Sequence, residues 1–190
     1  MTDEALIDAF LEDATDRMKK SVESTRTEFS SVRTGRASPH LLDRIQVDYY
    51  GTPTPLKNIA TINVPEPRML TIQPFDPSAM KQIERAIQES DLGLMPSIDG
   101  KIIRLPIPQL TEERRKEYVK VTRNMAEEGR VAVRNVRRDV MRHLEELVKG
   151  GDVGDDEERA AEARVQKLTD DHVAKIEELL KHKESEIMEV

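Results

Sequence analysis

The stretch TEERRKEYVKVTRNMAEEGRVAVRNVRRDVMRHLEELVK, residues 111–149, decides the fold of this chain. It contains no proline and a single glycine, Gly129, and its apolar residues recur at steps of three, four or seven. This spacing predicts one continuous helix with a single apolar stripe. The predicted stripe consists of Tyr118, Val121, Met125, Ala132, Val136, Val140, Leu144 and Leu147. At about 1.5 Å per residue the helix is roughly 58 Å long, so we expect a rod rather than a globule.

The same helix carries a set of arginines away from its predicted apolar stripe. At about 100° per residue, four of them fall within an arc of roughly 60° that lies nearly opposite the stripe. They are Arg123, Arg130, Arg134 and Arg137, and Arg138 and Arg142 extend the arc to one side. A guanidinium group matches phosphate oxygens bidentately, which favours an RNA-binding surface. The alternative is a solvated face paired with acids along the helix, but Glu127 and Asp139 are too few to pair with all the arginines.

Two further helices are predicted, over residues 2–32 and 155–187. Each has one apolar stripe at helical spacing. The first stripe is Leu11, Ala14, Met18, Val22, Thr25, Phe29 and Val32, and the second is Ala161, Val165, Leu168, His172, Ile176, Leu179 and Ile187. Three helices with single stripes bury them most simply against each other, so we expect a three-helix bundle running up, down and up.

The chain between the first two helices differs in kind. Eight of the ten prolines lie between positions 53 and 106. Alternating apolar residues predict strands at 45–49, 59–64, 69–72 and 102–105, with a turn at 51–55. Asp76 and Pro77 are typical of the start of a helix, whose apolar face is Met80, Ile83 and Ile87. The predicted class is α+β: a bundle domain formed by residues 1–33 and 108–190, with an inserted β/α/β domain over 34–107.

The two junctions between these domains contain residues that interrupt regular structure. Gly35 lies between Arg33 and Arg36 at the first junction, and Pro106 and Pro108 lie at the second. Glycine permits a left-handed turn and proline prevents simple continuation of a helix. We therefore interpret the two junctions as a hinge.

Composition and motifs exclude several classes of function. The net charge of −7 excludes a generic nucleic-acid binder, and residues 151–190 hold 6 basic and 13 acidic side chains, so any RNA-binding surface is local. The absence of cysteine, of a signal peptide and of an apolar run of about 20 residues predicts a soluble cytoplasmic protein. None of the four histidines has a metal-ligand partner at helical spacing, and His172 is interpreted as a residue at the core edge. No catalytic motif, metal site or cofactor site is expected.

Several long motifs resemble bacterial ribosome recycling factors. They are SVRTGRASPHLLD, GTPTPLKNIATI, SDLGLMPSIDGKIIRLPIPQLTEERRKEYVK, RVAVRNVRRD and VQKLTDDHVAKIEELLKHKESEIMEV. The similarity extends over essentially the whole chain, in order and with matching spacing. The resemblance implies an L-shaped, tRNA-like molecule, with an elongated three-helix-bundle arm and a β/α/β arm.

The resemblance also implies partners and site residues. A monomer of this family binds the post-termination ribosome, where the bundle lies over large-subunit rRNA. Elongation factor G with GTP then moves the smaller arm, the subunits separate, and initiation factor three keeps them apart. The arginines of VRNVRRD, here Arg134, Arg137 and Arg138, are implied to contact rRNA, whereas Arg33 and Arg36 either contact rRNA or brace the hinge.

Two other functions stay open on the sequence alone. A helical adaptor or chaperone could use the charged face to bind protein partners or RNA without splitting ribosomes. An enzyme with an unrecognised site is the weakest alternative. Steep salt dependence of binding distinguishes phosphate contacts from an adaptor that binds protein partners.

Overall fold

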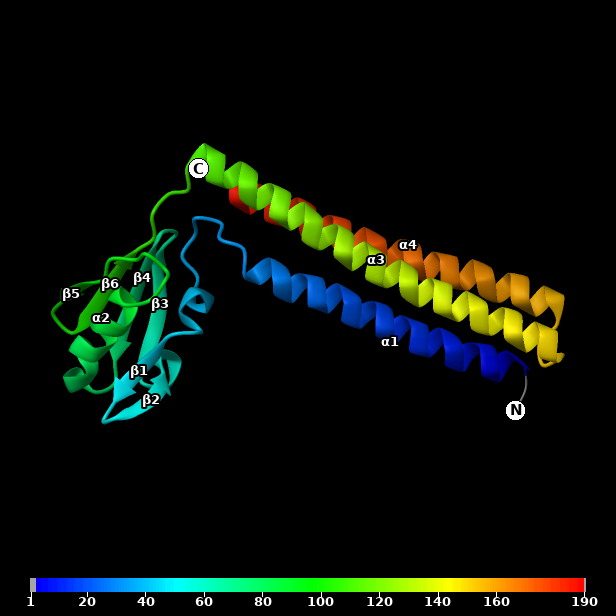
Figure 1. Ribbon diagram of the computed structural model, residues 1–190, viewed down its shortest axis with the longest axis horizontal. Helices are drawn as coiled ribbons and strands as arrows, with labels where there is room; N and C mark the ends of the chain where they lie inside the picture. Colours follow the sequence, from blue (N-terminus) through cyan, green and yellow to red (C-terminus); the bar gives the residue numbers. More distant parts are fainter. Residues whose placement is uncertain (1–2, 190) are drawn as a thin grey trace. The chain divides into compact units, whose positions relative to one another are not determined.

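The computed structural model describes residues 3–189 and divides the chain into two compact units. One unit contains the chain up to Val32 together with Lys116–Glu189, and the other contains Arg33–Arg115. The first unit is helical, and the second holds six short strands and one α-helix among the described residues (Figure 1). The fold class is therefore α+β, as predicted.

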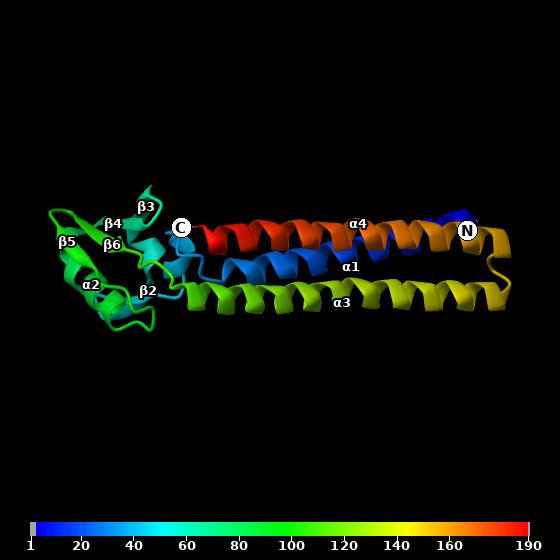
Figure 2. The same ribbon diagram turned by 90° about the horizontal axis from the view of Figure 1, so that it is seen from above.

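The helical unit is a three-helix bundle. Its helices are α1 (Asp3–Ser30), α3 (Glu112–Gly150) and α4 (Asp155–Met188). Helices α1 and α4 run in the same direction and α3 runs in the opposite one (Figures 1 and 2), which confirms the predicted up, down and up order. Among residues 3–189, no helix has the length and apolar character needed to cross a bilayer.

All seven residues of the first predicted stripe are buried: six lie in α1, and Val32 lies just beyond its last residue, Ser30. Buried Ile7 of α1 was not in the predicted stripe. The stripe of α3 was predicted less well, because Val121 is 43% exposed. The side chains that α3 buries are small along its first half. The full set of buried residues in α3 is Thr122, Ala126, Gly129, Val133, Val136, Val140 and Leu144. In α4, His172 is buried as expected, whereas Leu168 and Leu179 are only partly buried.

Gly129 marks a close approach of the three helices. A Cβ atom built at this residue would lie 2.2 Å from Oγ1 of Thr25 in α1 and 3.2 Å from Cδ1 of Ile176 in α4. Thr25 is buried, and its hydroxyl donates to the carbonyl of Ser21 at 3.1 Å. The absence of a side chain at Gly129 therefore lets α3 pack tightly against both neighbours.

Helix α3 has a defined cap at each end. Thr111 accepts a hydrogen bond from the Arg114 amide on Oγ1 at 3.2 Å, which confirms the predicted N-cap. At the other end Gly151 has φ 77°, and the Asp152 amide donates to the carbonyl of Leu147 at 2.9 Å. This left-handed glycine with a hydrogen bond five residues back is a Schellman motif, and Val153 is buried in the bundle core beyond it.

The small unit contains two antiparallel sheets. The first pairs β1 (Gln46–Tyr49) with β2 (Thr52–Pro55). The second has the order β3-β4-β6-β5, formed by β3 (Ala60–Glu66), β4 (Met69–Pro74), β6 (Ile102–Pro106) and β5 (Ser97–Asp99). Short 3-10 helices span Pro39–Leu42, Leu56–Asn58 and Pro77–Ala79.

Helix α2 (Met80–Gln88) packs its predicted face into the core of this unit. Met80, Ile83 and Ile87 are all buried. Asp76 caps the 3-10 turn that leads into α2, because its Oδ1 accepts from the Ser78 amide at 2.9 Å. The other members of this core are Leu42, Ile45, Val47, Leu56, Ile59, Ala60, Leu70, Ile72, Ala79, Leu94, Ile103 and Leu105.

Two strands differ from the sequence-based prediction. Residues 52–55, expected to be a turn, form β2, and β5 was not predicted at all. Pro53 and Pro55 lie opposite Asp48 and Gln46 of β1. Proline lacks an N–H and is tolerated where that side of an edge strand faces away from its partner. β2 therefore pairs with β1 although it contains two prolines. These prolines led the sequence analysis to predict a turn.

The β1–β2 turn uses a tyrosine in a left-handed conformation. Tyr50 has φ 51° and Gly51 has φ 79°, the signs that a two-residue type I′ hairpin turn requires. The Tyr50 hydroxyl donates to Oδ2 of Asp76 at 2.9 Å, and the Tyr49 hydroxyl donates to the same oxygen at 3.3 Å. These bonds tie the hairpin to the start of α2. Hydrogen bonds from the Ser78 hydroxyl and amide, followed by those from the two tyrosines, lower the pKa of the Asp76 carboxyl.

Candidate nucleic-acid interface

The four arginines of α3 that were predicted to lie opposite its buried stripe, Arg123, Arg130, Arg134 and Arg137, lie to one side of it, whereas Arg138 lies nearly opposite. At about 100° per residue, Arg137 lies roughly 60° from the centre of the buried stripe, Arg134 roughly 120° and Arg138 roughly 160°. The correction follows from the small buried residues at positions 122, 126 and 129, which rotate the true stripe relative to the predicted one. Part of the arginine set therefore faces neighbouring α4.

Two of the five predicted RNA-contacting arginines are paired with carboxylates. Arg123 donates from Nε to Oε1 of Glu184 in α4 at 2.5 Å. Arg130, whose side chain is 17% exposed, contacts Glu127 at 2.7 Å and Glu177 of α4. Hydrogen bonding from Arg130 lowers the pKa of the Glu127 carboxyl. Glu127 and Asp139 alone do not pair all the arginines, as expected, but the sequence did not indicate that α4 supplies carboxylates for Arg123 and Arg130.

The other three arginines are much less engaged. Arg134 is about half exposed, and its Nη1 lies 3.5 Å from Oε1 of Glu127, at the limit of a hydrogen bond. Arg138 is exposed and has no ion pair among residues 3–189. Arg137 is partly buried, and within the described chain its Nε has no hydrogen-bond partner although that atom is shielded from solvent. These three are the arginines for which the sequence resemblance implies rRNA contact, and we refer to them as the arginine triplet.

A buried guanidinium N–H without an acceptor is unfavourable, because desolvation of a polar group is not compensated. A phosphate oxygen accepts charge-assisted hydrogen bonds from guanidinium, and it reaches the shielded Nε of Arg137 only after that side chain reorients. The triplet also lies within two turns of one rigid helix. Its members can therefore engage adjacent phosphates without the loss of much conformational freedom.

Asp139 separates the triplet from Arg142 and holds α1 against α3. Its Oδ2 accepts from Nη2 of Arg17 in α1 at 2.8 Å, and its Oδ1 lies 3.4 Å from Nη2 of Arg142. The hydrogen bond from Arg17 lowers the pKa of the Asp139 carboxyl. This acid, which was expected to pair only within α3, therefore makes its shortest ion pair with another helix.

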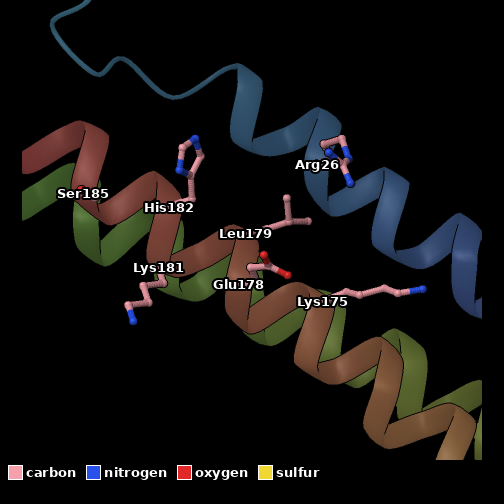
Figure 3. A pocket seen from close by; sticks show the side chains of 7 residues that line it. All are labelled: Arg26, Lys175, Glu178, Leu179, Lys181, His182 and Ser185. Carbon is pink, nitrogen blue, oxygen red and sulfur yellow. The ribbon is translucent and has the colours of Figure 1, made fainter.

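The groove between α1 and α4 contains a separate hollow of about 640 Å³ (Figure 3). Arg26 comes from α1, and the other lining residues come from α4, with Leu179 as the apolar one. Arg26 already pairs with Glu23 at 3.1 Å and His182 with Glu186 at 3.0 Å. Side chains of both signs line this open groove, so it offers no concentrated charge for a ligand. Across residues 3–189, no group of three or more His, Cys, Asp or Glu could hold a metal ion.

The residues predicted to form the hinge all lie in or beside the small unit. Arg33 donates from Nη2 to the carbonyl of Leu92 at 3.0 Å. Gly35 has φ 75°, Arg36 is exposed, and Pro106 is the last residue of β6, opposite Met69 of β4. Pro108 is exposed between β6 and α3. No pattern in the sequence pointed to Arg68, which contacts the second junction and is described below.

The fold and the arginine triplet define a class: an antiparallel three-helix bundle with an RNA-compatible flank, interrupted by an α+β unit. The family model for ribosome recycling factor matches residues 25–188. The chain belongs to the ribosome recycling factor family.

Similar proteins cover nearly the whole chain. The ribosome-recycling factor of Rubrobacter xylanophilus is 58% identical over 95% of this chain and 97% of its own length. That of Brevibacillus brevis is 52% identical, with coverage of 95% and 97%. A solution structure of a ribosome recycling factor matches with a TM-score of 0.75 and 43% identity, covering 97% of this chain and 98% of its own.

A second solved structure describes Thermus thermophilus ribosome recycling factor and Escherichia coli elongation factor G bound to the E. coli post-termination complex. A chain of that structure matches with a TM-score of 0.66 and 44% identity, and the match covers all of both chains.

Proposed function

We propose that this protein binds the post-termination ribosome in the cytoplasm and, with elongation factor G and GTP, splits it into subunits without catalysing a reaction itself. Membership of the family supports this proposal, as does the likeness over the full chain to a recycling factor solved on a post-termination complex. In this mechanism the bundle supplies binding energy and the small unit is the part that moves. Initiation factor three then prevents the subunits from rejoining.

The observation that carries the RNA-binding part is the state of the arginine triplet. Arg137 and Arg138 have no carboxylate partner within residues 3–189, and the contact of Arg134 with Glu127 is long. We assign the direct rRNA contacts to these three residues. Arg123 and Arg130 are proposed to contact rRNA as well, but only after exchanging or sharing their carboxylates on α4.

We propose that the small unit moves relative to the bundle, because the chain divides into two units that are joined by only two segments. Residues 33–38 lead into the small unit, and residues 106–111 lead out of it. These segments contain Arg33, Gly35, Arg36, Pro106 and Pro108, and we propose that the hinge lies within the segments or at their ends.

The proposal is tested by light scattering of post-termination ribosomes with elongation factor G and GTP. The parent protein is expected to cause dissociation, and Arg137→Ala is expected to weaken ribosome binding by about 10- to 150-fold, the effect of losing a charged hydrogen bond. The matched control is Arg159→Ala, on an exposed part of α4. The proposed function is wrong if the parent causes no dissociation, and the triplet assignment is wrong if Arg137→Ala and Arg159→Ala bind alike.

A further inference from the structure

Both segments that connect the small unit to the bundle are held by one turn of the small unit. The turn Pro67–Arg68 joins β3 to β4 (Figure 1). The carbonyl of Pro67 accepts from the Ala37 amide at 2.7 Å, and the carbonyl of Arg68 accepts from the Ile107 amide at 2.8 Å. Residues that precede β1 and residues that follow β6 therefore bond to the same two-residue turn.

Side chains add to these backbone bonds. With the Gln109 amide oriented so that its oxygen faces Arg68, that oxygen accepts from both guanidinium Nη atoms, with 2.8 Å to Nη2. Gly35 of the first segment lies against Leu110 of the second, since a Cβ built at Gly35 would be 3.6 Å from the Leu110 Cγ. The two segments thus contact each other as well as the turn.

Burial of the segments points the same way. Ala37 and Ile107 are partly buried and pack against the core of the small unit. Arg33 reaches the carbonyl of Leu92, also in this unit. From Arg33 to Ala37 and from Ile107 to Leu110, the connecting chain is therefore structurally part of the small unit and not a free linker.

Only short pieces of chain are left between these anchored segments and the helices. At the first junction the Val32 amide still donates to the carbonyl of Phe29 at the end of α1, and Val32 is buried. At the second junction α3 begins at Glu112, directly after its capping residue Thr111. A helix resists bending, so movement must be concentrated where neither the helix nor the turn holds the backbone.

We propose that the Pro67–Arg68 turn is a clasp that fixes both connecting segments to the small unit, so that bending occurs at Val32–Arg33 and Leu110–Thr111. Arg68 is then a positioning residue. The significance of the clasp for ribosome splitting rests on the proposed function. With the clasp in place, bending does not occur at Gly35, Pro106 or Pro108, because these residues lie within or between the anchored stretches.

The first test uses the unmodified protein, free in solution. The Ala37 and Ile107 amides are expected to be protected from hydrogen exchange as well as the sheet amides of β4 and β6. Their ¹⁵N order parameters are expected to be near the rigid value of about 0.85. Order parameters below about 0.6, with exchange at the rate of an open loop, would overturn the clasp.

The second test removes the Arg68 side chain. Arg68→Ala is expected to speed exchange of the Ile107 amide by about tenfold or more and to lower the order parameter of Gln109, whereas exposed Arg44→Ala changes neither. Arg68→Lys, which keeps the charge but lacks the fork, is expected to restore little of the protection. Unchanged exchange at Ile107 in Arg68→Ala would refute the positioning role of Arg68.

The same variants separate the clasp from the function. Arg68→Ala is expected to bind ribosomes like the parent protein but to split them more slowly, because force on the small unit is transmitted through looser segments. Splitting at the parent rate, once Ile107 exchange has accelerated, would refute the role of the clasp in splitting. If the parent itself does not split ribosomes, the proposed function fails, and the exchange measurements still decide whether the clasp exists.

Discussion

Replacing Gly129 by alanine separates two opposing effects on the stability of the bundle. In an exposed helix the change is favourable by about 1 kcal/mol, because alanine has the higher helix propensity. At Gly129 the new Cβ would lie 2.2 Å from Oγ1 of Thr25, so the two helices must separate by roughly 1 Å to reach normal contact. Overpacking of this kind costs about 1–3 kcal/mol.

Subtracting the propensity gain of about 1 kcal/mol from this cost leaves a net loss of about 0–2 kcal/mol. Because 2.2 Å is far below a normal contact, we expect Gly129→Ala to lower the free energy of unfolding by an amount near the upper end of that range. Urea unfolding followed by far-UV circular dichroism measures this change, because most of the helical signal comes from the bundle. Gly150→Ala is the matched control. A Cβ there meets only the movable carboxylate of Asp152, at 3.1 Å, and the variant is expected to be neutral or slightly more stable.

A double-mutant cycle identifies the atom responsible. Thr25→Ala removes Oγ1 and leaves the Cβ of residue 25, which lies 3.3 Å from the point where a Cβ at Gly129 would stand. The double variant is expected to be more stable than the sum of the single changes predicts, by at least about 1 kcal/mol. Additivity within about 0.5 kcal/mol, or a gain of stability in Gly129→Ala alone, would refute this account of how the helices pack.

Two further predictions concern acids. The pKa of Asp139 is lowered, chiefly by the hydrogen bond from Arg17, so this acid stabilises the fold above its unfolded pKa of about 3.8 and the contribution is lost as pH falls through the folded value. The thermal unfolding midpoint of Asp139→Asn should therefore be lower than that of the parent at pH 7, and the gap between the two midpoints should be smaller near pH 2. The control Asp16→Asn should unfold at the parent midpoint. A gap that stays constant with pH would show that the Asp139 carboxylate does not contribute to the pH dependence of stability. Tyr50→Phe removes the hydroxyl that holds the left-handed turn to Asp76, so hydrogen exchange in β1 and β2 should accelerate while the bundle stays unchanged, and unaltered exchange would show that the turn does not need this bond.

The sequence predicted elements best where one kind of residue occupies the buried face. In α1 the stripe from Leu11 to Phe29 is almost entirely apolar, so periodicity alone identified it. In α3 the tightest contact is made by Gly129, with Thr122 and Ala126 nearby, and hydrophobicity does not distinguish such residues from surface ones. The prediction therefore followed larger apolar residues such as Val121, and the arginine face rotated with it.

The ion pairs between α3 and α4 could not be predicted from the sequence, for a different reason. Glu177 and Glu184 are separated from Arg130 and Arg123 by 47 and 61 residues. Which acid meets which arginine depends on the axial register of α3 and α4, and periodicity along one helix does not report it. The contact of Arg68 with Gln109 was missed for a similar reason, because it depends on the pairing register of β4 and β6, which the sequence does not report.

The two prolines of β2 have a consequence for the behaviour of the protein in a crowded cell. The outward side of Pro53 and Pro55 presents no N–H, so another extended chain finds no regular row of donors there. A hairpin with valines at these positions would leave that edge open to β-addition by a neighbouring molecule. The two prolines that made β2 look like a turn in the sequence thus also protect its outer edge from edge-to-edge pairing with other chains.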